Sequence, residues 1–203
     1  MFAIVATAYK IDAEITERFF RNHKNRNVFL VTDETEKDFG ESFRIIPAPE
    51  MDIFSITRCA NIGIRAAIKS GASIITKTDI DCVVTVEAER DLCARVRNGY
   101  GYAMKYWGVD PATMDYAHAT RIPRVMGTCC MTAHDWVSCG LYNDAMHGYG
   151  FDDYDITRRA NRAGIHVPTI DRPKIYHIDH AEKHNRDTIN PLKREENIQI
   201  SGI

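Results

Sequence analysis

The chain has 203 residues, a length that suits one domain with a real hydrophobic core. Its 26 lysines and arginines nearly balance its 28 aspartates and glutamates, so the overall charge indicates no polyanion or membrane surface as a partner. No apolar stretch reaches the roughly 18 residues of a membrane helix, and the start of the chain lacks the basic lead-in of a signal peptide, so we expect a cytoplasmic protein without membrane insertion.

Strands and helices alternate through the first part of the chain. Apolar runs predict strands over residues 2–9, 27–34, 42–49 and 72–81. Apolar residues at helical spacing predict helices from about Asp12 to His23 and from Thr57 to Ser70. This order predicts an α/β fold with a mostly parallel central sheet flanked by helices, in which ligands bind at the carboxyl ends of the strands.

The later part of the chain continues the mixed pattern. We expect, in order, a helix near 86–96, a strand over 99–108, a loop over 109–123, a strand and short helix over 124–140, and a strand over 165–170. Residues 181–203 are polar and weakly patterned, so we expect an arm or a tail there. Residues 1–180 are expected to form a single domain.

Two aspartates interrupt an apolar segment where the fourth strand ends. Residues 74–84 read IITKTDIDCVV, and in a strand Asp79 and Asp81 would share one face, with Cα atoms roughly 7 Å apart. Two carboxylates that close repel each other, so a buried strand end tolerates them only beside a positive group. That group is either an arginine or lysine partner or a divalent cation. Asp33 ends the second strand and belongs to the same edge.

A second acidic group precedes a predicted helix in GYGFDDYDITRRANRAG, residues 148–164. Asp152, Asp153 and Asp155 crowd its start and arginines occupy its later turns, as the helix dipole favours. Capping accounts for two of these acids, but the Gly-Tyr-Gly lead-in indicates a tight turn that lets another group approach. From the residues alone, a structural and a functional interpretation are both open.

Three histidines cluster late in the chain, at positions 177, 180 and 184. On a helix they would share one face and indicate zinc. No cysteine lies beside them, however, and the residues before them look like the end of a strand. Donation of a single histidine to a metal already held by Asp79 and Asp81 is the more economical interpretation.

Polar residues also line one face of the helix predicted over 57–70. Arg58, Asn61 and Arg65 follow one another at spacings of three and four, so they project together. They form either a solvated helix face or, for Arg58 and Asn61, groups that reach the same rim as the strand-end aspartates.

Taken in order, these segments resemble the GT-A glycosyltransferases. The likeness rests on RCANIGIRAA, ITKTDID, GTCCMTAHDWVSCGLYND, HGYGFDDYDITRRANRAGI and YHIDH. It is closest to the branch with bacterial polysaccharide-forming transferases, β1,4-galactosyltransferases and polypeptide N-acetylgalactosaminyltransferases. A DxD alone is a weak signal, whereas DxD followed at this distance by G-[WY]-G-x-[ED]-D-x-D-[IL] and Y-H is a strong one. The resemblance implies a Rossmann-like GT-A domain over 1–180, with a nucleotide-sugar-binding half, 1–95, and an acceptor or catalytic half, 96–180.

The resemblance implies a manganese or magnesium ion on the pyrophosphate of a nucleotide sugar. Asp79 and Asp81 correspond to the DxD, with Asp81 favoured as the direct ligand. His177 corresponds to the third protein ligand, with His180 as the alternative. The identity of the metal is left open between the two ions.

The nucleotide and acceptor sites follow from the same resemblance. Asp33 corresponds to the acid that contacts the base, usually uracil, and Arg58 and Asn61 correspond to helix residues that line the donor site with Asp79.

Asp153 corresponds to the catalytic base of inverting members, and Asp152 to the acid that helps hold the acceptor hydroxyl. The family usually has Glu where Asp152 stands, and Tyr154 replaces a residue that is often acidic. At a reference pKa of about 3.9, Asp153 would be ionised at neutral pH.

The sequence therefore predicts a metal-dependent inverting hexosyltransferase that uses a UDP-sugar donor. Its acceptor would be a glycan, a protein, a small molecule or a modified nucleobase. One alternative is a sugar-phosphate nucleotidyltransferase, against which the lack of a glycine-rich basic loop after the first strand argues. The other is a catalytically inactive sugar-binding protein on the same scaffold.

Overall fold

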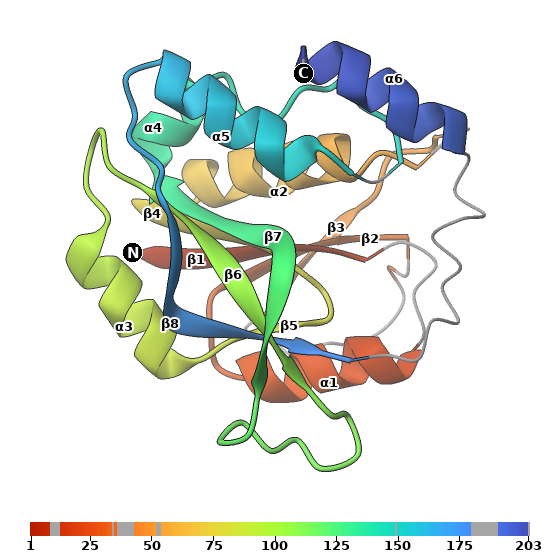
Figure 1. Cartoon of the computed structure of the whole chain (residues 1–203), viewed down its shortest axis with the longest axis vertical. Helices are drawn as coiled ribbons and strands as arrows, with labels where there is room; N and C mark the ends of the chain where they lie inside the picture. Colours follow the sequence, from red (N-terminus) through yellow and green to blue (C-terminus); the bar gives the residue numbers. More distant parts are fainter. Residues whose placement is uncertain are drawn as a thin grey trace.

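One sheet organises the part of the chain that the computed structural model describes, which comprises residues 1–8, 13–33, 35, 43–51, 54–148, 150–179 and 191–202. The strands are β1 Phe2–Ala8, β2 Val28–Thr32, β3 Phe43–Pro47, β4 Ile74–Asp79, β5 Cys82–Val84, β6 Tyr102–Val109, β7 Thr120–Thr132 and β8 Thr169–Ile178. The helices are α1 Ala13–His23, α2 Ile56–Lys69, α3 Val86–Arg95, α4 Ala133–Ser138, α5 Asp152–Arg162 and α6 Pro191–Ser201. The strands form a curled eight-stranded sheet in the order β3-β2-β1-β4-β7-β6-β8-β5, with helices on both faces (Figure 1).

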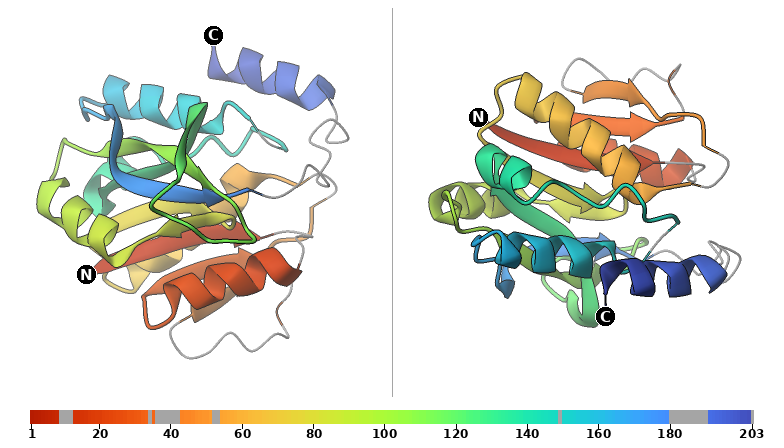
Figure 2. Two further views of the ribbon diagram at one scale, coloured as in Figure 1. Left: turned by 60° about the horizontal axis from the view of Figure 1, so that its bottom comes forward. Right: turned by 90° about the horizontal axis from the view of Figure 1, so that it is seen from above.

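The first half of the sheet is parallel, as the sequence predicts. β1 pairs in parallel with β2 and β4, and β2 pairs in parallel with β3. The crossovers place α1 and α2 on opposite faces of these strands (Figure 2). Beyond β4 the sheet is mixed, because β7 runs antiparallel to β4 and β6, whereas β8 runs parallel to β6. The predicted α/β fold is confirmed, and its continuous parallel part ends at β4.

Several element boundaries differ from those expected. β4 ends at Asp79, and the next two residues turn into β5, which the apolar pattern does not separate from β4. β7 begins at Thr120, inside the expected loop, because pairing with β6 draws this polar segment into the sheet. β8 covers Thr169–Ile178 rather than residues 165–170. Residues 9–12, where the first strand was expected to end and the first helix to begin, lie outside the described residues.

Helix α6 occupies much of the expected polar tail. It lies against α5 (Figures 1 and 2) and buries Asn197 and Ser201. The segment carries too few apolar residues for a helical stripe, which is why the sequence pattern predicts no element there. None of the described helices is long and apolar enough to cross a membrane.

Two buried clusters hold the helices to the sheet. The cluster on the α2 face includes Val5, Ile64 and Trp136, each 0% exposed. The cluster on the α1 and α3 face includes Phe19, which is also 0% exposed. Gly63 allows α2 to approach the sheet closely, since a Cβ there would collide with Val5. The carboxyl edge of the strands is thus fixed from both sides.

His23 ties the end of α1 to β5, the strand that follows the second aspartate of the DxD. Its side chain is fully buried; Nδ1 lies 2.8 Å from the carbonyl oxygen of Phe19, and Nε2 accepts a hydrogen bond from Val84 N at 3.1 Å. Burial lowers the pKa of His23 to about 4. The ring is therefore neutral at ordinary pH, as its acceptor role requires.

We predict that His23 makes the fold less stable as the pH drops from 6.5 to about 4. The unfolded histidine, with a pKa of 6.5, binds a proton in this window, whereas the buried ring does not until about pH 4. The gap between the two pKa values corresponds to about 3 kcal/mol of unfolding free energy. Urea denaturation of the wild type and His23→Gln should show the wild-type advantage shrinking by that amount, and a constant difference would contradict a buried neutral ring.

Candidate functional site

The carboxyl edge of the parallel strands gathers the acidic residues that end them. In the sheet register, Thr7 of β1 lies beside Asp79 of β4, and Ala8 lies beside Thr32 at the end of β2. Asp33 follows directly and is exposed. The structure thus brings Asp33 and Asp79 to the same edge, as the α/β pattern predicts.

A buried lysine pairs with the first aspartate of the DxD. The side chain of Lys77 is 1% exposed, and its Nζ donates to Asp79 Oδ1 at 2.8 Å and to the carbonyl of Gly127 at 3.2 Å. The same Nζ lies 5.9 Å from the centre of the Tyr142 ring. Burial alone would lower the pKa of Lys77, but the surrounding acidic groups, Asp79 foremost, raise it well above its ordinary value. A lysine partner, one of the two possibilities that the sequence left open, is therefore present for Asp79.

Tyr106 of β6 holds the other oxygen of Asp79. Its hydroxyl donates to Asp79 Oδ2 at 2.9 Å and accepts from Thr128 at 3.2 Å. Thr128 in turn shares a hydrogen bond with Thr78 at 2.7 Å. Gly127 makes this arrangement possible, since a Cβ there would collide with Tyr106 Oη and Asp79 Oδ2. Both carboxylate oxygens of Asp79 are thus anchored, which fixes the orientation of the group.

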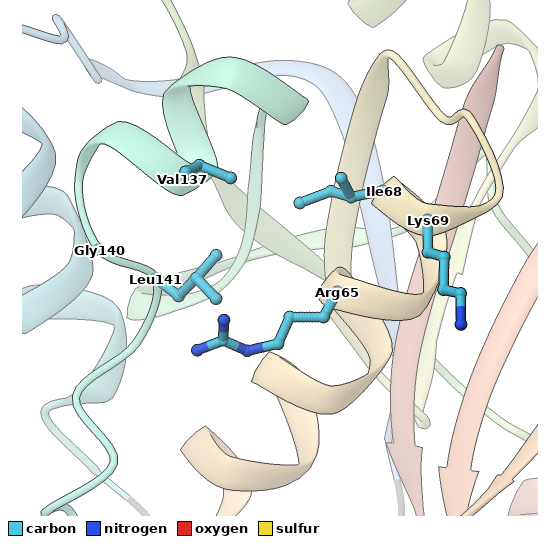
Figure 3. Close-up of a pocket in the computed structure, with 6 residues that line it drawn as sticks. All are labelled: Arg65, Ile68, Lys69, Val137, Gly140 and Leu141. Carbon is cyan, nitrogen blue, oxygen red and sulfur yellow. The ribbon is translucent and has the colours of Figure 1, made fainter.

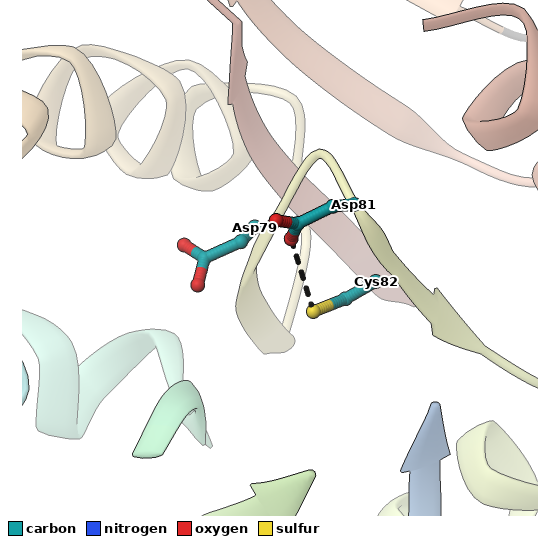
Figure 4. A group of neighbouring side chains, drawn as sticks. All are labelled: Asp79, Asp81 and Cys82. Carbon is teal, nitrogen blue, oxygen red and sulfur yellow. Dashed lines mark hydrogen bonds between the residues drawn. The ribbon is translucent and has the colours of Figure 1, made fainter. Parts of the chain in front are cut away.

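The second aspartate lies in the turn between β4 and β5, not in an extended strand. Asp81 Oδ1 accepts a hydrogen bond from the Cys82 thiol at 3.4 Å (Figure 4), and Asp81 Oδ2 lies 3.2 Å from His177 Nε2. The antiparallel pairing of β5 and β8 sets Cys82 opposite His177, and this brings the imidazole to Asp81. Because His177 lies on a strand, the helical face that a zinc site would need is not formed there.

These donors fit a hard divalent cation. Ligand atoms of Asp79, Asp81 and Cys82 lie within 4.8 Å of one another. Burial raises the pKa of Cys82 well above its ordinary value, so this sulfur is a protonated thiol, whereas carboxylates and imidazole are ligands of manganese and magnesium. Burial lowers the pKa of His177, but the hydrogen bond and charge of Asp81 outweigh it and raise the pKa overall. The site therefore stabilises positive charge beside Asp81.

The second acidic group begins α5 behind a tight turn. Gly148, Gly150 and Phe151 have positive φ angles of 65°, 101° and 65°. Asp152 is 6% exposed, and its Oδ1 accepts from Gly150 N at 3.2 Å. Asp153 Oδ1 is buried and has no hydrogen-bond partner among the described residues. Phe151 is the N-cap residue and makes no side-chain capping bond, so capping does not account for these acids.

The acidic pair interacts electrostatically with the DxD. Burial raises the pKa of Asp153 well above its ordinary range; the charges of Asp152 and Asp79 raise it further, and Lys77 opposes them. Burial likewise raises the pKa of Asp152, again against Lys77. The expectation of an ordinary pKa for Asp153 is therefore wrong. Three carboxyl groups, those of Asp79, Asp152 and Asp153, thus surround one buried ammonium.

The N-terminal half of α2 binds a neighbouring loop. Asn61 is 3% exposed; its amide donates to the carbonyl of Tyr142 at 2.9 Å and to Asp144 Oδ1 at 2.7 Å, and its Oδ1 accepts from Tyr142 N at 2.9 Å. Arg58 is exposed and donates to the carbonyl of Asp144 at 3.1 Å. The prediction of a solvated helix face is therefore wrong for Asn61. Its hydrogen bonds to the backbone of Tyr142 hold the Tyr142 ring near Lys77.

Sequence reasoning missed Lys77, Tyr106 and Tyr142. The signal for Lys77 was present, because the period of two that aligns side chains along a strand places it on the same face as Asp79. The two tyrosines carry no comparable local signal, since their contacts depend on β6 pairing and on the loop after α4. His180, the alternative metal ligand, and Tyr149 of the Gly-Tyr-Gly motif lie outside the described residues.

A hollow of about 300 Å³ lies at the C-terminal end of α2, away from these residues (Figure 3). It is lined by Arg65, Ile68, Lys69, Val137, Gly140 and Leu141. The lining has no acidic or imidazole side chain and shares no residue with the candidate site. We therefore assign the hollow no part in that site.

No family model and no curated protein matches the sequence. Among solved structures, GalNAc-T7 with UDP, GalNAc and Mn²⁺ is similar over 98% of this chain and 48% of that chain, with a TM-score of 0.68 and 12% identity. S. aureus TarS in complex with UDP-GlcNAc is similar over 98% of this chain and 65% of that chain, with a TM-score of 0.69 and 12% identity. Another TarS structure has a TM-score of 0.62 at 13% identity, with 98% and 42% covered. Both proteins are GT-A glycosyltransferases, so the chain has the GT-A fold, and it spans about half to two thirds of the chains named first.

We predict that Lys77→Met destabilises the fold by about 3 kcal/mol, because it leaves the partly buried Asp79 carboxylate beside the acidic pair without its counter-charge. Urea denaturation measures this loss. Lys69→Met, an exposed lysine on α2, is the matched control and should change stability by less than about 0.5 kcal/mol. The double variant Lys77→Met with Asp79→Asn should recover part of the loss. Wild-type stability of Lys77→Met would show that the ion pair is not needed.

Proposed function

We propose that the chain is a metal-dependent inverting glycosyltransferase that transfers a sugar from a UDP-sugar to an acceptor hydroxyl. The observation that carries this proposal is the convergence of two acidic groups on one buried ammonium at the carboxyl edge of the sheet. The similar structures with UDP, GalNAc and Mn²⁺ and with UDP-GlcNAc support the donor class. The acceptor is a glycan, a protein, a small molecule or a modified nucleobase.

Asp81 and His177 would hold a manganese or magnesium ion, with Asp79 as the further carboxylate. When bound, the ion neutralises as a Lewis acid the negative charge that develops on the departing diphosphate. The contact between Asp81 and His177 and the grouping of Asp79, Asp81 and Cys82 ligand atoms support this assignment. Lys77 and Tyr106 keep Asp79 oriented, so this carboxylate can also contact the donor.

The remaining donor contacts come from the edges of the same site. Asp33, exposed after β2, is assigned to the uracil base, and Arg58, exposed on α2, to the nucleotide. Asn61 acts on the donor site through the loop that it holds, because its amide group is already occupied by Tyr142 and Asp144.

Asp153 is assigned as the general base. Its Oδ1, which has no hydrogen-bond partner among the residues that the structure describes, can accept the acceptor's proton as the hydroxyl oxygen bonds to the anomeric carbon. The bond to the diphosphate breaks on the opposite face, UDP leaves, and the anomeric configuration inverts. Asp152, oriented by Gly150 N–H, helps hold the acceptor hydroxyl.

We predict that Asp81 and Asp153 separate donor binding from transfer. A panel of nucleotide sugars with Mn²⁺, scored by thermal shift, identifies the donor that stabilises the wild type by mass action. Asp81→Ala and His177→Ala should lose this shift because they remove metal ligands. Asp153→Asn should keep the shift and lose transfer by roughly a hundredfold to ten-thousandfold, since the amide cannot take the proton.

Asp171→Asn is the control for these variants, because Asp171 is half exposed and pairs with Arg121 outside the candidate site. It should bind and transfer as the wild type does. Wild-type donor shifts in Asp81→Ala would refute the metal role. Release of pyrophosphate instead of UDP would identify a nucleotidyltransferase, and binding without consumption of any donor would favour a sugar-binding protein.

We predict that, as the pH is lowered, the rate of sugar transfer falls at pH values well above the ordinary titration range of aspartate. The base works ionised, and burial together with Asp152 raises the pKa of Asp153, so its proton returns at a higher pH than for a solvated carboxyl. The pH profile of kcat measures this limb. Asp152→Asn removes the neighbouring charge and should move the limb to lower pH, whereas Asp171→Asn should leave it in place. A limb unaffected by Asp152→Asn would argue against Asp153 as the titrating base.

A further inference from the structure

The backbone before the acidic pair is held by a side chain of the last helix. Asn197 of α6 is 2% exposed; its Oδ1 accepts from His147 N at 3.1 Å, and its amide donates to the carbonyls of His147 at 2.8 Å and Gly150 at 3.2 Å. One amide group thus satisfies both backbone groups of His147 and continues to Gly150. Gly150 N in turn donates a hydrogen bond to Asp152 Oδ1. Asn197 is therefore two hydrogen bonds from the acidic pair.

The same backbone is held on its other side by the start of α2. Gly148 N donates to the carbonyl of Phe54 at 2.6 Å, and Ser55 Oγ donates to the carbonyl of Met146 at 2.8 Å. The stretch that leads into α5 therefore lies between two supports, the start of α2 and helix α6.

This backbone needs external support. Gly148 and Gly150 lie at positive φ. Because glycine has no side chain, its backbone can also adopt many other conformations of similar energy. In the described residues of this stretch, the hydrogen bonds to other elements go to the start of α2 and to α6 rather than to a strand of the sheet. If one support were lost, buried backbone groups would be left unpaired, and the loop would move to satisfy them.

Helix α6 has a second attachment to the unit that carries the acidic pair. Arg158 of α5 donates from Nη1 to the carbonyl of Ser201 and, at 2.7 Å, to the carbonyl of Gly202. Asn197 of α6 therefore binds the loop before α5, and Arg158 of α5 binds the end of α6. The helix spans the unit from the loop to the body of α5 (Figure 2).

We propose that Asn197 is a positioning residue for sugar transfer: α6 braces the loop that sets Asp152 and Asp153 against the acceptor. This inference rests on the proposed function of the acidic pair. It makes residues 191–202 part of the catalytic half of the site, although the sequence pattern suggests a tail. The proposed metal ligands Asp79, Asp81 and His177 are held by the pairing of β4, β5 and β8 within the sheet and do not depend on α6.

The test is to separate transfer from donor binding in Asn197→Ala. We expect kcat to fall by about tenfold to a hundredfold, because small misplacement of a base is costly, while the Mn²⁺-dependent Kd for the UDP-sugar stays within about twofold. Hydrogen exchange should become faster at the Gly148 and Gly150 amides and stay unchanged along β4. Gln199→Ala, on the exposed side of α6, is the matched control and should change none of these.

Each outcome decides the proposal. Unchanged kcat in Asn197→Ala overturns it, and so does an equal loss of kcat and donor affinity with faster exchange throughout, which would mean a merely structural role. If Asn197→Ala does not fold, Arg158→Met loosens the second attachment and is judged in the same way. If the wild type transfers no sugar, the proposed function fails, and local exchange at Gly148 and Gly150 alone decides whether Asn197 braces this loop.

Discussion

The ion pair between Lys77 and Asp79 is the interaction on which the candidate site depends. A buried ammonium is stable only with acidic groups around it, and the charges of Asp79, Asp152 and Asp153 supply them. In return, Lys77 lowers the cost of burying these carboxylates. The balance is incomplete, since three carboxyl groups share one ammonium and Asp153 Oδ1 has no hydrogen-bond partner in the described part of the chain. A fold keeps such an imbalance where a cation or a proton transfer uses it, which is why perturbed carboxylates concentrate at functional sites.

Much of the donor side could be predicted from local pattern. Alternating strands and helices imply a parallel sheet, a parallel sheet brings strand ends to one edge, and Asp33 and Asp79 end two of these strands. The turn at Asp81 was not predictable in this way, because β5 has only three residues and exists through its pairing with β8. That pairing, between segments far apart in the sequence, also brings His177 to Asp81. The pattern of residues did not decide which histidine would join the aspartates, whereas the resemblance to GT-A enzymes implied His177.

The acidic pair shows the opposite case, in which the motif was visible and its physical state was not. The lead-in glycines indicated a tight turn, and the positive φ angles confirm it. The raised pKa of Asp153 depends on how deeply α5 packs and on which charges face it from β4, and neither is encoded near residue 153. The role of α6 was hidden for a similar reason. Its attachment uses hydrogen bonds from two polar side chains, Asn197 and Arg158, which leave no apolar stripe in the sequence.

The two sides of the site therefore differ in what maintains them. The position of the DxD follows from strand pairing, and the fold that this pairing builds is shared at 12% identity with a TM-score of 0.68. The side that carries Asp153 is set by a loop at positive φ between the start of α2 and α6, so its geometry depends on particular residues such as Ser55 and Asn197. A substitution at either residue can therefore displace the acidic pair while the sheet keeps the DxD in place.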